Sequence, residues 1–404
     1  MAFTLLSLTI FIIFLQPASI FPGIYLINPV RNITIISIIV YILFGDKNRV
    51  NFINNKTNRY LLMYAGINIF SGMLIWLGYI RDSLVVWLLY LIIYFLLVKQ
   101  CFTMERIKKI ALMIVIAVAY LSYYSLTKFV VNFQLGGRAG GFGWYENPND
   151  LSLILVCTIP LAMLLAESTK GGFRRLPFYF LAGMFFLNVL FTGSRSGLLA
   201  VILVSTMSIY FTGASSKLLK SAILIILLFS IIGTGLSVVL GRGDLKGLLG
   251  DDSSENRLIQ WEAGFRMVKA NPFFGVGPDG FEQVATDYQG IGGLAPHNTL
   301  LQVFAETGIP GGCFFVMFAC YPLLVSWSYI KKNWRHTNKS AAQIYHQYLF
   351  AALCGFWVCA FFSNRYKSYI LYVLIALLVA VNESIAINNT EYNSNKSVPL
   401  NTCC

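Results

Sequence analysis

His297 is the histidine whose position best suits it for chemistry. The sequence contains three histidines. Two of them, His336 and His346, lie in a strongly basic segment, whereas His297 immediately precedes a predicted helix that begins at Asn298. The positive end of a helix dipole disfavours imidazolium, and an imidazole that is neutral near neutral pH can act as a general base. We therefore expect a catalytic role for His297; the alternative is that it only caps or packs this helix.

Three arginines lie in settings that are unusual for a charged side chain. Arg195 lies in FTGSRSGLLA, a very short connection between two apolar segments, where a charge is costly unless it is paired or faces a polar cavity. Arg138 lies in the glycine-rich GGRAGGFGWYENPND, where backbone can approach a ligand closely. Arg257 lies on a predicted helix. Because guanidinium groups keep their charge and bind phosphates through a planar fork, the three arginines together predict an anion site.

Two of these arginines also have an ordinary explanation, which stays open. The side chain of Arg257 could extend to lipid headgroups. Arg138, the less certain member of the site, could instead pair with Glu146 or Asp150, which lie in the same segment.

The sequence predicts neither a metal centre nor a cofactor site. Asp251 and Asp252 resemble half of an acidic metal site, but a helix N-cap explains the pair more simply, and no third carboxylate follows at a suitable spacing. There is no P-loop, no dinucleotide fingerprint and no GxSxG nucleophile elbow. The hydrophilic loops hold no paired cysteines of the kind that bind zinc or form disulfides.

The elements that must position these residues are membrane-spanning helices. The chain has 404 residues, of which 57% are hydrophobic and only 12% are charged, about half the charge of a soluble protein. We predict an all-α fold, a single polytopic membrane domain over residues 1–404 with about twelve transmembrane helices. The predicted spans are residues 2–20, 29–44, 60–79, 82–98, 110–130, 150–166, 177–192, 196–212, 220–240, 311–330, 347–363 and 368–384.

The charge distribution predicts the orientation of these spans. The net charge of +13 does not indicate nucleic-acid binding, because no soluble basic domain is present to bind it. When the loops between consecutive predicted spans are numbered from the N-terminus, the basic residues concentrate in the even-numbered loops and in a short tail, residues 385–404. This is expected for cytoplasmic segments. We therefore expect both termini in the cytoplasm.

The long loop between spans 9 and 10, residues 241–310, then lies outside the cytoplasm, and we call it the lid. The sequence of the lid predicts one helix from about Asp252 to Asn271. After the glycine-rich FFGVGPDGF, it predicts a second helix from Asn298 to about Gly308. The first helix carries an apolar stripe, which we expect to rest on the membrane domain or its interface; the stripe consists of Leu258, Trp261, Phe265 and Val268.

These segments resemble a known family. Arg195 in TGSRSG, then NRLIQW followed by NPFFGVGPDGF, then PHNTLLQVFAETGIPGG together look like the bacterial O-antigen ligase and O-antigen polymerase superfamily. The upstream GRAGGFGWYENPNDLSL is similar to a further segment of that family. The resemblance covers about residues 138–312, and it depends on the order, spacing and common sidedness of the motifs.

The resemblance implies a metal-independent, inverting glycosyltransferase of the bacterial inner membrane whose active site faces the periplasm. Its donor would be a glycan linked to undecaprenyl diphosphate. Arg195 and Arg257, with Arg138 as the less certain third member, would bind the donor diphosphate. His297 would take the proton from an acceptor hydroxyl or hold that hydroxyl in line.

The acceptor and the reaction class have alternatives. We favour an O-antigen ligase, which passes the glycan to lipid A–core in lipopolysaccharide biosynthesis. An O-antigen or exopolysaccharide polymerase would pass it to another lipid-linked glycan, and a protein O-oligosaccharyltransferase would pass it to a protein. A transporter or flippase for lipid-linked saccharides would also use an anion site, but the internal repeats common in transporters are missing and His297 would have no function in it. The sugar, the linkage and the oligomeric state stay open.

Overall fold

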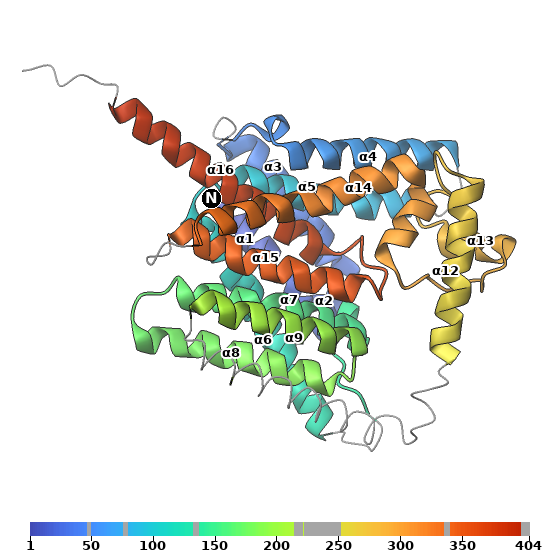
Figure 1. The fold of residues 1–404 in the computed structure, drawn as a ribbon, viewed down its shortest axis with the longest axis horizontal. Coiled ribbons are helices and arrows are strands. Elements are labelled where there is room, and N and C mark those ends of the chain that lie inside the picture. The colour runs from blue at the N-terminus through green and yellow to red at the C-terminus, as the bar shows by residue number, and fades with distance from the viewer. Residues whose placement is uncertain are drawn as a thin grey trace, which may run out of the picture.

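The computed structural model describes residues 1–46, 50–75, 80–131, 137–213, 221, 252–334 and 340–396, and over these residues it is all-helical. Figure 1 shows most helices running along one common direction. The α-helices are α1 (Ala2–Leu15), α2 (Pro17–Ile20), α3 (Pro29–Phe44), α4 (Lys56–Leu74), α5 (Ile80–Gln100), α6 (Met104–Val131), α7 (Pro148–Glu167), α8 (Gly172–Phe191), α9 (Arg195–Thr212), α12 (Asp252–Ala270), α13 (Phe281–Val284), α14 (Thr299–Lys332), α15 (Ala341–Ala360) and α16 (Tyr369–Lys396). Short 3-10 helices are η1 (Pro22–Ile27), η2 (Phe52–Asn54), η3 (Gly143–Tyr145) and η4 (Ala285–Tyr288).

The described helices include six that are long and apolar enough to cross a membrane: Ala2–Ile20, α6, α7, α9, α14 and Tyr369–Ile387. Two shorter apolar helices are Pro29–Phe44 and Leu84–Gln100. Over the described residues the chain is therefore an all-helical membrane protein, as predicted. The predicted number of about twelve spans is not confirmed, and the predicted ninth span, residues 220–240, lies almost entirely outside the described residues.

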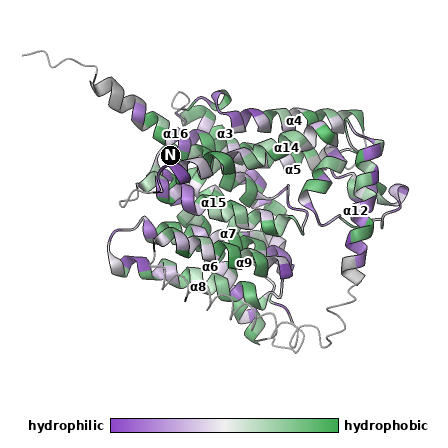
Figure 2. Ribbon diagram, in the orientation of Figure 1, coloured by the Kyte–Doolittle hydropathy of each residue, from purple (hydrophilic) through white to green (hydrophobic). Residues whose placement is uncertain are grey.

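Two helices form the centre of the bundle. Every residue of α7 from Leu151 to Ala166 is buried, as is α16 from Tyr369 to Val381. A helix that is apolar on all sides fits only where other helices surround it, and α7 packs against α6, α8, α9 and α15. Figure 2 shows the apolar residues that run along the bundle, while the polar residues concentrate near its ends and on α12.

The helix that follows His297 is broken at Gly308, where the sequence predicts a helix end. Gly308 has φ 70° and ψ −177°, so α14 consists of a short helix and a long one joined at a kink. Only glycine adopts such a backbone without strain, and a Cβ at this position would lie 2.5 Å from the carbonyl carbon of Phe273. The short first part of α14 therefore belongs to the lid, and the second part belongs to the bundle.

The glycine-rich segment after α12 fills the kink of α14. A helix break leaves backbone carbonyls without their helical partners. Here the carbonyl of Ala305 accepts from Val276 N at 2.9 Å, and that of Glu306 accepts from Gly277 N at 3.0 Å. Gly275, with φ 67°, approaches so closely that a Cβ would lie 2.4 Å from the Glu306 backbone. Main-chain hydrogen bonds within the lid thus hold the glycine-rich segment to the first part of α14.

Helix α12 stands across one end of the bundle (Figure 1). The N-terminus lies toward the opposite end, and α16 extends beyond the bundle there too (Figure 1). This places both ends of the described chain away from the lid; the side of the membrane that each end faces stays a prediction. Helix α16 also continues to Lys396, past the predicted end of the last span.

Much of the apolar stripe of α12 is exposed and does not pack on the membrane domain, so the other predicted possibility, that the stripe rests on the membrane interface, stays a prediction. Leu258 and Phe265 are 64% and 65% exposed, whereas Gln260, Ala263 and Met267 on another face are buried. Gln260 decides the orientation, because its amide nitrogen donates to the carbonyls of Ile291, at 2.9 Å, and Leu294, while its amide oxygen accepts from Ile291 N at 3.0 Å. A buried amide with its hydrogen bonds satisfied fixes one face of the helix, and Trp261, Phe265 and Val268 of the stripe border a groove.

Candidate functional site

The three predicted arginines lie around one cavity. Arg138, Arg195 and Arg257 line a space of about 460 Å³ at the end of the bundle where α12 lies. They come from three separate elements: the segment before α7, the start of α9 and the lid. The remaining lining residues are Asn149, Gly193, Ser196, Leu199, Leu258, Trp261 and Phe362. The cavity therefore combines positive charge with apolar walls, which suits an amphipathic anion.

A tight turn between α8 and α9 positions Arg195. Gly193 has φ 58°, and Ser194 caps α9 by accepting from Gly197 N at 3.3 Å. Arg195 is thus the first residue of α9 and its side chain is exposed. The free N–H groups of a helix start favour an anion, so the backbone of this turn adds to the charge of Arg195.

Arg138 is held against the same turn. Its Nε donates to the carbonyl of Thr192 at 2.8 Å, and its Nη2 donates to Oδ1 of Asn149 at 3.1 Å. Asn149 also lines the cavity. These two contacts hold the Arg138 guanidinium at the cavity wall. Asp150, one of the two alternative partners considered for Arg138, forms an ion pair with Arg365.

His297 lines a second, smaller cavity beside the first. This space of about 190 Å³ is also lined by Asn256, Arg257, Gln260, Leu294 and Ala295. Arg257 therefore borders both cavities and connects the arginine cluster with the histidine. The helix start is as predicted, because Asn298 caps α14 by accepting from Leu301 N at 3.1 Å.

The backbone of His297 is strained and its imidazole favours the neutral form. His297 has φ 49°, a left-handed conformation that is uncommon for residues other than glycine. Partial burial, followed by the positive charges of Arg257 and Arg365, lowers the pKa of His297 below 6.5. A cation next to an imidazole opposes its protonation. At neutral pH His297 is therefore a neutral imidazole that can accept a proton.

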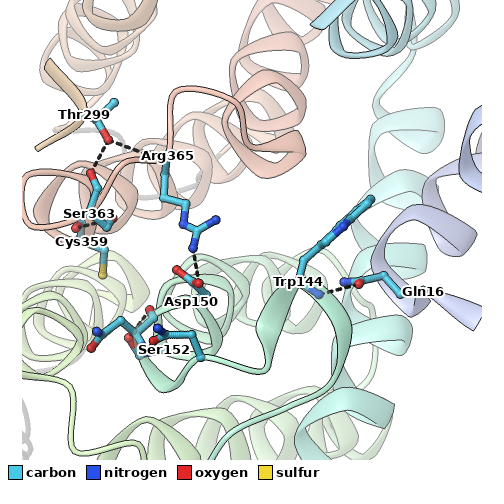
Figure 3. A network of polar contacts seen from close by, with 10 residues as sticks. Gln16, Trp144, Asp150, Ser152, Thr299, Cys359, Ser363 and Arg365 are labelled. Atoms are coloured by element: carbon cyan, nitrogen blue, oxygen red, sulfur yellow. Dashed lines mark hydrogen bonds and ion pairs between the residues drawn. The ribbon is translucent and has the colours of Figure 1, made fainter. Parts of the chain in front are cut away.

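Arg365 was not predicted from the sequence, and Asp150 was considered only as an alternative partner of Arg138. Arg365 lies between α15 and α16, and its guanidinium pairs with the Asp150 carboxylate in the first turn of α7 (Figure 3). One signal could have found Arg365: like Arg195, it is a charged residue in a short connection between two apolar segments. No pattern along the chain could have paired it with Asp150, because the two are far apart in sequence.

A third polar cavity lies within the lid, between the segment around α13 and the first part of α14. It measures about 270 Å³ and is lined by Asp279, Glu282, Gln283, Gln302 and Glu306. Lys367 pairs with Asp279, and the hydroxyl of Tyr366 donates to Glu306. Among the described residues, no group of three His, Cys, Asp or Glu side chains is arranged to hold a metal ion. Tyr366 also donates to Asp279 at 3.2 Å, so it joins Asp279 and Glu306 in one hydrogen-bonded cluster.

The comparison with known families agrees with the resemblance seen in the motifs. Residues 180–316 match the family model described as O-antigen ligase. This range includes Arg195, Arg257 and His297 but not Arg138. No curated protein matches the chain. The family implies ligase-type glycosyl transfer with a lipid-linked glycan and a glycan acceptor as partners. The match over residues 180–316 thus supports the O-antigen ligase and O-antigen polymerase superfamily for this part of the chain.

Proposed function

We propose that this protein is an O-antigen ligase that transfers a glycan from undecaprenyl diphosphate to lipid A–core. The observation that carries the proposal is the arrangement of the two cavities. Three arginines surround the larger one, a neutral histidine lines the smaller one, and Arg257 borders both. Transfer from a diphosphate to a hydroxyl requires an anion site and a base side by side.

The arginine-lined cavity would hold the diphosphate of the donor. A diphosphate leaving group gains negative charge as the glycosidic bond breaks, and positioned guanidinium groups stabilise that charge without a metal ion. Arg195 would act together with the start of α9, Arg257 would act from the lid, and Arg138 would add a third charge. The apolar wall formed by Leu199, Trp261 and Phe362 would contact the sugar or the first isoprene units.

His297 would act on the acceptor. A neutral imidazole can take the proton of an acceptor hydroxyl as its oxygen attacks the anomeric carbon. The attack displaces the diphosphate from the opposite face, so the configuration at that carbon inverts. The low pKa of His297 keeps it neutral at the pH of the periplasm, where we place the lid.

Transfer in a reconstituted system tests this proposal. The full-length protein in liposomes would receive a radiolabelled glycan on undecaprenyl diphosphate and one of three acceptors: lipid A–core, unlabelled lipid-linked glycan, or an unfolded protein rich in serine and threonine. We expect label on lipid A–core. The variant Arg195→Gln should abolish this transfer, whereas Arg174→Gln, an exposed arginine near the start of α8, should leave it unchanged.

The other outcomes identify the alternative functions. Growth of the lipid-linked glycan itself would make the protein a polymerase, and label on the protein acceptor would make it a protein O-oligosaccharyltransferase. A labelled lipid that crosses the bilayer without forming a new glycosidic bond would make it a transporter. Any of these results would contradict the ligase proposal.

A further inference from the structure

Arg365 connects three elements that meet at the two cavities. Its backbone N–H donates to Oγ1 of Thr299, in the first turn of α14, at 2.8 Å. The Thr299 hydroxyl donates in turn to the carbonyl of Ser363 at 2.6 Å. The Arg365 guanidinium reaches in the other direction and pairs with Asp150 (Figure 3). One residue of the connection between α15 and α16 thus holds both α7 and α14.

Each end of this network lies next to a member of the candidate site. Asp150 directly follows Asn149, which lines the arginine cavity and accepts from Arg138 at 3.1 Å. Thr299 lies two residues after His297, which lines the other cavity. The network therefore spans the distance between the group that would hold the donor and the group that would activate the acceptor.

The backbone of His297 needs such an anchor. A left-handed conformation at a residue other than glycine persists only where its surroundings determine it. On one side of His297, the carbonyl of Pro296 accepts from Nε1 of Trp261 at 2.8 Å. On the other side, Thr299 is fixed by Ser363 and Arg365. His297 is thus held between α12 and the α15–α16 connection.

We propose that Arg365 and Asp150 form a positioning pair, which fixes His297 relative to the arginine-lined cavity by holding the α15–α16 connection against both α7 and α14. This inference rests on the proposed glycosyl transfer. Neither residue needs to touch the substrate. Thr299 Oγ1 holds the backbone of Arg365, and the Asp150 carboxylate holds its guanidinium. Loss of the Arg365 charge or of the Asp150 charge would therefore let the start of α14 move.

The same pair sets the electrostatic surroundings of His297. Arg257 faces His297 from α12 and Arg365 faces it from the α15–α16 connection, and both cations lower the pKa of His297. Asp150, from α7, partly neutralises Arg365. Arg365→Gln should therefore raise the pKa of His297, whereas Asp150→Asn should lower it further. These opposite directions are a signature that simple loosening of the fold does not produce.

Carbethoxylation of His297 tests the pair without relying on transfer. Diethyl pyrocarbonate modifies the neutral imidazole, so the modification of the His297 peptide, followed by mass spectrometry as a function of pH, reports its protonation. The full chain in nanodiscs would be compared as wild type, Arg365→Gln, Asp150→Asn and Arg365→Lys. The control is Arg266→Gln, which removes a charge from the same lid, where Arg266 pairs with Glu262.

We expect the midpoint to rise in Arg365→Gln, to fall in Asp150→Asn, and to stay at the wild-type value in Arg365→Lys and Arg266→Gln. In transfer assays, kcat should fall about 100-fold in Arg365→Gln and Asp150→Asn, the effect of a misplacement of about 1 Å, with little change in the donor KM. Arg365→Lys should restore most of kcat.

Midpoints that do not move, or that move in one direction in both Arg365→Gln and Asp150→Asn, would overturn the positioning pair. So would wild-type kcat in both variants. If the wild type itself transfers no glycan, the proposed function fails, and the carbethoxylation midpoints still decide whether the pair acts on His297.

Discussion

Arg257 borders both cavities, so we expect it to bind the donor diphosphate and also to lower the pKa of His297. Substitutions of Arg257 can separate these two effects. In Arg257→Gln the donor diphosphate loses one of three guanidinium groups. Removal of one preorganised group that stabilises developing negative charge lowers kcat about 100- to 1,000-fold. Arg257→Lys keeps the charge but loses the planar fork. Loss of one charged hydrogen bond, about 1.5–3 kcal/mol, corresponds to a fall of about 10- to 100-fold.

The pH dependence of the two variants should differ. After burial, the Arg257 charge is the largest cause that lowers the pKa of His297 below 6.5. A general base works in its neutral form, so activity is lost as the pH falls through the pKa of His297. In Arg257→Gln this pKa rises, and the acid limb of the pH–rate profile moves to higher pH. In Arg257→Lys the limb should stay near its wild-type position.

The assay is the initial rate of glycan transfer at saturating donor, measured between about pH 5 and pH 8, where a histidine titrates. Three results would refute the reasoning. Arg257→Gln could retain kcat within about twofold, which would remove Arg257 from the donor site. The acid limbs of the Gln and Lys variants could coincide, or that of Arg257→Gln could move to lower pH, and either result would mean that the Arg257 charge does not act on His297.

Three further predictions concern the lid and the chemistry. In a denaturant titration, Gly308→Ala should lower the free energy of unfolding by more than about 2 kcal/mol, because a Cβ there meets backbone atoms and φ is 70°. The control is Gly66→Ala, in open space on α4, which should not destabilise the protein. Gln260→Leu should leave the N–H and C=O of Ile291 without their partner and cost about 1–3 kcal/mol; hydrogen exchange of the Ile291 amide should rise, and unchanged exchange would contradict this. Transfer should continue in EDTA after removal of divalent ions, and loss of activity that added Mg²⁺ restores would show that the arginines do not suffice.

Local chemistry along the chain predicted the helix boundaries of the lid well. The Asn298 cap and the break at Gly308 follow from the residue types at those positions, because capping and a positive φ are local requirements. The setting of Arg195 was also predictable, since a charge between two apolar helices must face a polar space, and Arg195 lines the larger cavity.

The packing of the lid could not be predicted in the same way. Helical periodicity identified the apolar stripe that contains Phe265, but the buried face of α12 is the one that holds Gln260. A glutamine counts as polar in any periodicity analysis, and only the loop that Ile291 belongs to makes its burial favourable. The Arg365–Asp150 pair was missed for a related reason: it joins residues that only the folded bundle brings together.

The measurement that tests the central claim most directly is transfer of a labelled glycan from undecaprenyl diphosphate to lipid A–core by wild type and by His297→Asn. Asparagine tolerates the left-handed backbone of His297, so this variant removes the base with little change to the fold. We predict that wild type forms the labelled glycolipid, and that His297→Asn binds the donor with wild-type affinity but does not form the product. Equal product formation by the two proteins would contradict the account.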